Sequence, residues 1–171
     1  MMDPTQAQLA RLEDAMHAFV RCIRTLPEER FLQRMEGWTW APRDVVAHMV
    51  GWLRYTVEGS QQILQGQLPF FFADPGEDWS HVNAVLVRAY PSTDREALLG
   101  ELQAAFGELA RFLRALDPAD WDRDFGLRYE GYTITIRDSV EAHVEDFTDH
   151  RRQIAAWAEG RPWPSSVAGA E

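Results

Sequence analysis

The chain has 171 residues, of which 46% are hydrophobic and 12% aromatic, and this composition suffices for one domain (1–171) with a sizeable core. The 17 basic and 27 acidic residues give a net charge of −10, which repels phosphate backbones and anionic lipid surfaces, so we expect no nucleic-acid partner and no membrane partner. No stretch approaches the ~20 apolar residues of a membrane span, and no signal-peptide pattern is present, which predicts a cytoplasmic protein.

Apolar residues recur at alternating steps of three and four from about Thr5 to Thr25, which predicts an amphipathic helix. Pro27 ends this helix, and a short connector follows. Pro42 opens a second helix at its first turn, where the missing amide has no cost. We expect this second helix to run to about Gln65.

Between Gly66 and Asp78, two prolines, one glycine and three consecutive phenylalanines predict an irregular loop. The apolar side chains of Phe70 to Phe72 would form a lid or a dimer contact, or would fold back onto the core. The helical pattern restarts at Trp79, and Pro91 interrupts it. Thr93 and Glu96 then form a capping-box pattern, so we expect one interrupted third helix.

A short extended stretch around Tyr132 to Thr135 precedes the last helix, which Thr135 can cap and which should end at Gly160. A C-terminal tail follows from about residue 161. The chain shows no internal repeat and no sustained alternation of period two. Four long helices therefore predict an all-α fold, a four-helix bundle.

Histidines interrupt the apolar stripes of two predicted helices. A buried imidazole needs a partner for each ring nitrogen, so three imidazoles facing one small core predict a polar site. The stripe of the second helix is Val45, His48, Trp52, Tyr55 and Gly59, and that of the last helix is Ile136, Val140, His143, Phe147, His150, Ile154 and Trp157.

The spacing selects which of these groups can share a metal ion. His143 and His150 are ~10 Å apart along the helix at 1.5 Å per residue, too far to share one ion directly. Asp146 and His150 lie one turn apart on one face, and His48 would meet them across the bundle. We therefore expect His48, Asp146 and His150 to hold a divalent metal ion, with His143 as a neighbouring acid or base. The alternative is that the histidines are hydrogen-bonded packing residues.

Aromatic side chains flank these positions. Trp38, Trp52 and Trp79, together with Trp40, would line a pocket for an organic substrate, or would pack the end of the bundle. Asn83 would reach the site as a polar group, or would only cap the restart of the third helix.

Three segments carry a family resemblance: GWTWAPRDVVAHMVGW at 37–52, DWSHVNA at 78–84 and DFTDHRRQI at 146–154. They resemble the DinB/YfiT-like superfamily and, within it, the ClbS/DfsB-like branch. The resemblance implies an up-down-down-up bundle whose metal, often zinc, nickel or iron, is held by one histidine of the second helix and two of the fourth. Asp146 stands where histidine is usual, and an aspartate can bind zinc, manganese or iron through oxygen.

The resemblance also implies detoxification of a small molecule. A metal-dependent hydrolase or thiol transferase that modifies a small electrophile or toxin is the first hypothesis. A non-catalytic bundle, related to stress or sequestering a hydrophobic ligand, with a vestigial metal site, is the alternative. A third is a structural protein, and a homodimer is the expected oligomeric state.

Overall fold

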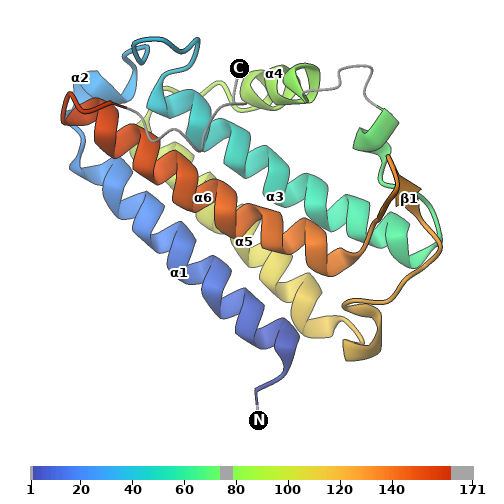
Figure 1. Cartoon of the computed structure of the whole chain (residues 1–171). Helices are drawn as coiled ribbons and strands as arrows, with labels where there is room; N and C mark the ends of the chain where they lie inside the picture. Colours follow the sequence, from blue (N-terminus) through green and yellow to red (C-terminus); the bar gives the residue numbers. More distant parts are fainter. Residues whose placement is uncertain (1, 74–78, 163–171) are drawn as a thin grey trace.

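The computed structural model describes residues 2–73 and 79–162 (Figure 1). Its α-helices are α1 (Pro4–Thr25), α2 (Glu28–Phe31), α3 (Pro42–Leu64), α4 (Ser80–Ala89), α5 (Arg95–Ala115) and α6 (Ile136–Ala158). Two short 3₁₀-helices, η1 (Phe70–Ala73) and η2 (Pro118–Asp120), and a two-stranded antiparallel hairpin of β1 (Arg128–Tyr129) and β2 (Tyr132–Thr133) join them. The predicted all-α class is confirmed, with this hairpin as the one sheet in the described ranges.

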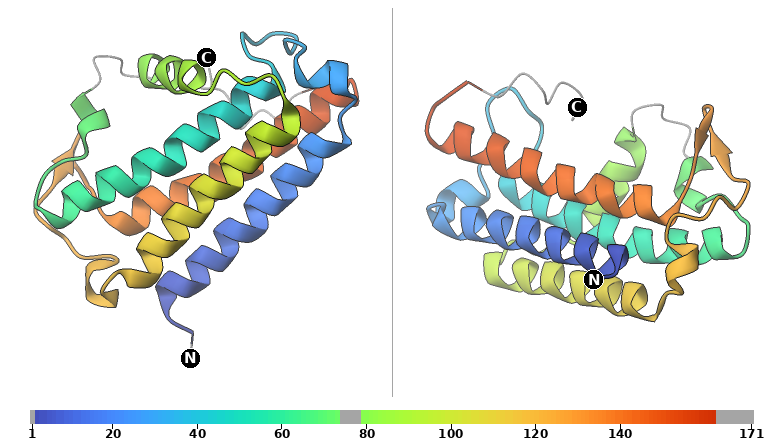
Figure 2. Two further views of the ribbon diagram at one scale, coloured as in Figure 1. Left: turned by 180° about the vertical axis from the view of Figure 1, so that it is seen from behind. Right: turned by 60° about the horizontal axis from the view of Figure 1, so that its bottom comes forward.

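The four long helices lie side by side in both views of Figure 2. α1 packs mainly along α6 and α3 mainly along α5, while α1 also contacts α5 and α3 also contacts α6. The shorter α4 packs on α3 outside this group (Figure 1). The region between α3 and α6, where the histidines lie, is therefore enclosed by long helices on one side and bordered by α4 on the other.

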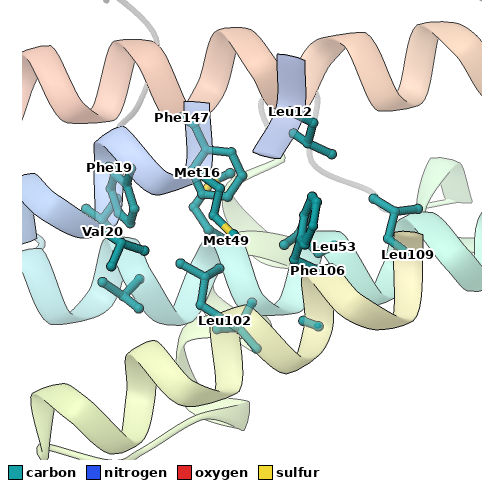
Figure 3. Close-up of a cluster of buried hydrophobic side chains, with 14 of the residues drawn as sticks. Leu12, Met16, Phe19, Val20, Met49, Leu53, Leu102, Phe106, Leu109 and Phe147 are labelled. Atoms are coloured by element: carbon teal, nitrogen blue, oxygen red, sulfur yellow. The ribbon is translucent and has the colours of Figure 1, made fainter. Parts of the chain in front are cut away.

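The main core fills the space between the long helices (Figure 3). Phe19 and Phe147 are fully buried, with ring centroids 5.4 Å apart, and join α1 to α6. Burying one such side chain contributes about 1.5–3 kcal/mol. Other buried side chains of this core come from α1, α3 and α5: Leu12, Met16, Met49, Leu53, Leu102, Phe106 and Leu109.

The ends of α1, α3 and α6 follow from local sequence. The Asp3 side chain accepts a hydrogen bond from the Thr5 amide at 3.0 Å and caps α1. Pro42 occupies the first turn of α3, as predicted. The Thr135 hydroxyl accepts from the Asp138 amide at 3.1 Å, which confirms the predicted cap of α6. α6 ends at Ala158, and Gly160 takes the left-handed conformation with φ +65° that commonly follows a helix.

The predicted interrupted third helix is two separate helices, α4 and α5. The predicted capping box of Thr93 and Glu96 is wrong, because Asp94 caps α5: its carboxylate accepts a hydrogen bond from the Ala97 amide at 2.7 Å. Backbone carbonyl groups between α4 and α5 accept hydrogen bonds from α3: the Arg43 guanidinium donates to the carbonyl of Tyr90 at 2.6 Å. The break after α4 is thereby tied to the start of α3.

A second, smaller group of buried apolar side chains lies between α3, η1 and α4. This side cluster consists of Phe71, Val82 and Leu86, with Trp52, Tyr55, Phe72 and Trp79 packed against it. A Cβ atom on Gly59 of α3 would lie 2.8 Å from the Phe71 ring, so only glycine allows this approach. Phe71 thus folds back onto the protein, while Phe70 stays 37% exposed.

Some predictions fall outside the described residues. The end of the expected loop, 74–78, and most of the expected tail, 163–171, are not described. Within the ranges 2–73 and 79–162, no helix combines the length and the apolarity needed to cross a membrane.

Candidate functional site

α3 and α6 bring the three predicted histidines into one buried region. His48, His143 and His150 are 6%, 5% and 6% exposed, although each stands on a stripe where an apolar residue would be usual. The rings of His48 and His150 meet across the interface with centroids 5.3 Å apart and planes at 88°. The two helices therefore place His48 beside His150, as the stripes predicted.

The imidazoles differ in how their nitrogens are paired. The Nδ1 atom of His150 lies 3.0 Å from Oε1 of Gln153. The Nε2 atom of His143 lies 2.5 Å from the hydroxyl of Thr56. The Nδ1 atom of His48 is buried and has no hydrogen-bond partner among the described residues. A buried polar atom without a partner is uncommon, and it marks a place where water, a ligand or an ion completes the site.

Burial keeps the two facing imidazoles neutral. Burial and, to a smaller extent, the nearby His150 lower the pKa of His48 to about 3, against smaller opposing effects of Asp146 and of a hydrogen bond with Asn83. Burial also lowers the pKa of His150, although Asp146 and Gln153 oppose this shift. Neutral imidazole is the form that binds a metal ion, because its lone pair is free.

Asp146 lies at the edge of this group, with a side chain that is 47% exposed. Its Oδ2 atom is 3.8 Å from Nδ1 of His143, an electrostatic contact longer than a hydrogen bond. Partial burial would raise the pKa of Asp146, but His143 and, more weakly, His150 and His48 lower it below its usual value. The carboxylate is therefore charged and interacts with all three imidazoles.

These donors fit a divalent ion in their chemistry. Two neutral imidazoles and one carboxylate are a common ligand set for zinc and iron. Two imidazoles that share an ion have ring centroids within about 6.5 Å of each other, since each nitrogen lies about 2.1 Å from the metal, and the observed 5.3 Å meets this limit. As the side chains stand, no three His, Cys, Asp or Glu in the described part of the chain form a metal-holding group. Asp146 would have to turn inward to complete one.

Two tryptophans from the segment before α3 cover the histidine pair. Trp38 stacks on His150 with ring centroids 6.0 Å apart, and Trp40 lies against His48 at 5.1 Å. The two indoles also stack on each other at 5.5 Å. Of the predicted pocket residues, Trp38 therefore borders the metal candidates directly, and Trp40 belongs with it.

The remaining predicted pocket residues lie on the α4 side. The indole Nε1 of Trp52 donates to Oδ1 of Asn83 at 2.8 Å, and the Trp52 ring meets the edge of His48 with centroids 6.4 Å apart. Trp79 contacts Trp52 at 6.0 Å and belongs to the side cluster. The backbone of Trp79 has φ 61°, so this residue starts α4 in a left-handed conformation. Asn83 thus joins α4 to α3 and does not cap α4.

Two polar partners of the histidines were missed in the sequence. Thr56 lies two turns after His48 on α3, at the i+4 spacing that continues the column His48, Trp52, Thr56. Gln153 follows His150 by three residues on the same face of α6. Both are buried, and this spacing was the available signal.

Comparison with solved structures shows the same fold in several bacterial proteins. The colibactin self-resistance protein ClbS is 12% identical, with a TM-score of 0.73, over 93% of this chain and 98% of that one. DfsB, a sibling lethal factor precursor, is 14% identical with a TM-score of 0.75, over 94% and 98%. An uncharacterised protein from Escherichia coli UTI89 is 17% identical with a TM-score of 0.71, over 94% and 95%. No curated protein matches the chain.

One of these structures contradicts a prediction. The crystal structure of ClbS is a complex with double-stranded DNA. We expected no nucleic-acid partner because the net charge of the chain is negative, and this expectation was wrong. A net charge averages over the whole surface, whereas nucleic acid is bound by the local arrangement of basic groups.

The family is assigned from the sequence itself. Residues 8–154 match the DinB superfamily, and this span runs from the first turns of α1 to the last turns of α6. It includes the three histidines, Asp146 and the tryptophans around them. The chain belongs to the DinB superfamily.

Proposed function

We propose that this chain is a DinB-like divalent-metal-binding protein that acts as a metal-dependent hydrolase or thiol transferase on a small electrophile or toxin. The observation that carries the proposal is the buried pair of neutral imidazoles, His48 and His150, in which one ring nitrogen of His48 has no partner. The proposal includes the up-down-down-up course of a DinB-like bundle. It is supported by α1 and α6 beginning at the end of the molecule where α3 and α5 terminate (Figure 1).

Each residue of the candidate site would have a separate role. His48, His150 and Asp146 would hold the ion, and zinc, nickel, iron and manganese all suit two nitrogens and one oxygen. A bound divalent ion supplies Lewis acidity, which activates a water molecule or a thiol near neutral pH. His143 would hold or move a proton beside this centre. Trp38, with Trp52, Trp79 and Asn83 beyond it, would exclude water and contact the apolar part of the substrate.

Elemental analysis of tag-free protein tests the proposal. We expect a stoichiometric divalent metal in the wild type, its loss in His150→Ala, and its retention in His17→Ala. His17 is an exposed histidine of α1 and serves as a matched control. A wild-type protein that contains no stoichiometric metal and takes up none of the four metals on reconstitution would refute the proposal.

The second candidate function is a non-catalytic, stress-related or ligand-sequestering bundle with a vestigial metal site. The stacked Trp38 and Trp40 favour it, since they offer an aromatic surface that needs no metal. Binding of an aromatic dye such as anilinonaphthalene sulfonate, unchanged by EDTA and by His150→Ala, would support this candidate. A homodimer and a cytoplasmic location remain predictions, and sedimentation velocity checks the first.

A further inference from the structure

The hydroxyl of Thr56 makes one short buried contact, 2.5 Å to Nε2 of His143. Both side chains are buried, with Thr56 2% exposed and His143 5% exposed. A helical threonine often donates to the carbonyl four residues earlier, as Thr148 does to Val144 at 2.9 Å. Thr56 makes no such bond within the described ranges, and its hydroxyl is used for His143 alone.

The surroundings of His143 decide which ring nitrogen carries the proton. Nδ1 faces the Asp146 carboxylate at 3.8 Å and has no other partner. A carboxylate accepts but does not donate, so a proton on Nδ1 is attracted to it, while a lone pair there would be repelled. Nε2 then holds the lone pair and accepts from the Thr56 hydroxyl. In the opposite tautomer Nε2–H would donate to Thr56, and as the side chains stand the Thr56 hydroxyl proton would have no acceptor among the described residues.

We propose that Thr56 is a positioning residue: its hydroxyl holds the His143 ring with Nδ1–H toward Asp146, and this chain of three groups keeps the Asp146 carboxylate beside the histidine pair. The second half of this statement rests on the proposed function, in which Asp146 is a metal ligand. Asp146 needs such support because its side chain is half exposed and has no hydrogen-bonded partner of its own among the described residues. Groups behind a metal ligand commonly orient it in this way.

The tautomer of His143 is measurable without any metal or substrate. In ¹⁵N-labelled, EDTA-treated protein, long-range ¹H–¹⁵N spectra separate protonated from unprotonated ring nitrogens, and His143→Gln assigns the resonances. We expect the singly protonated ring of His143 to carry its proton on Nδ1 in the wild type and in Thr56→Ser. In Thr56→Val, which keeps the shape but removes the hydroxyl, we expect the Nε2–H form to appear.

Ser60→Ala is the matched control. Ser60 lies one turn beyond Thr56 on the same helix, is 1% exposed, and its hydroxyl has no partner among the described residues. Its removal should leave the His143 resonances unchanged. A wild-type protein with the proton on Nε2, or a Thr56→Val spectrum identical to the wild type, would overturn the inference. If Thr56→Val does not fold, the wild-type and Thr56→Ser spectra still decide it.

Zinc affinity, measured by chelator competition, tests the second part of the proposal, that Thr56 positions Asp146 through His143. Loss of a group behind a metal ligand lowers affinity about 10- to 100-fold, so we expect a decrease of this size in Thr56→Val, restored in Thr56→Ser and absent in Ser60→Ala. Unchanged affinity in Thr56→Val, with zinc bound by the wild type, would overturn the role assigned to Thr56 at Asp146. A wild type that binds no metal would refute the proposed function and this role together, while the NMR result would still stand for or against the tautomer.

Discussion

Acidification of the metal-free protein tests whether His48 is held neutral in the fold. Its pKa is lowered from 6.5 to about 3, chiefly by burial and then by His150. Because the unfolded chain takes up a proton below about pH 6.5 and the folded chain does not, acid favours unfolding. The stabilising effect of a neutral His48 is therefore complete above about pH 6.5 and is lost as the pH falls toward 3.

The size of the loss follows from the two pKa values. Between about pH 7.5 and pH 5.0, protonation of the unfolded His48 lowers the free energy of unfolding by about 2 kcal/mol. The pKa of His150 is also lowered by burial, so this residue adds a loss in the same direction. Substitution of His48 by glutamine removes its titration from the unfolded chain, and with it about 2 kcal/mol of the pH dependence.

The assay is urea unfolding at both pH values in the presence of EDTA. We expect His48→Gln to lose less stability on acidification than the wild type, and the exposed-site control His17→Gln to lose as much as the wild type. Equal losses in the wild type and His48→Gln would show that His48 gains its proton in the folded state, and the account of a buried neutral imidazole would then be wrong.

Two further substitutions test the contact of α4 with α3. In Gly51→Ala the new Cβ would lie 2.6 Å from the Leu86 side chain, so we expect a loss of about 1–3 kcal/mol by thermal unfolding. Gly100→Ala on α5 meets nothing within 4 Å and should instead gain about 0.5–1 kcal/mol; similar effects at both positions would contradict the close approach. Trp52→Phe removes the donor to Asn83 and should cost about 1 kcal/mol in urea unfolding. A double-mutant cycle with Asn83→Ala that shows no coupling would contradict this bond.

The helices were predictable because the apolar period and the prolines act locally. The steps from Leu9 to Ile23 gave α1, and Pro42 gave the start of α3. The cap of α5 was not found, since Thr93 and Asp94 are both good caps and their backbone conformation decides between them. The separate course of α4 depends on its packing against Gly51, which is distant in sequence.

In the candidate site, too, local patterns were predictable, whereas contacts between helices were not. The stripes correctly placed His48, His143 and His150 in the interior, because helical phase is a local property. They also placed Asp146 on the inner side, whereas its carboxylate lies half exposed beside His143. The contact of His143 with Thr56 depends on the register between α3 and α6, which no single helix encodes.

The two groups of buried apolar side chains give the protein two levels of stability. The main core joins four long helices, but within the described ranges the side cluster has three buried members: Phe71, Val82 and Leu86. Segments with few buried contacts open without global unfolding. The backbone amides of α4 should therefore exchange with solvent sooner than those of α3, and the aromatic region next to Asn83 becomes accessible while the bundle remains folded.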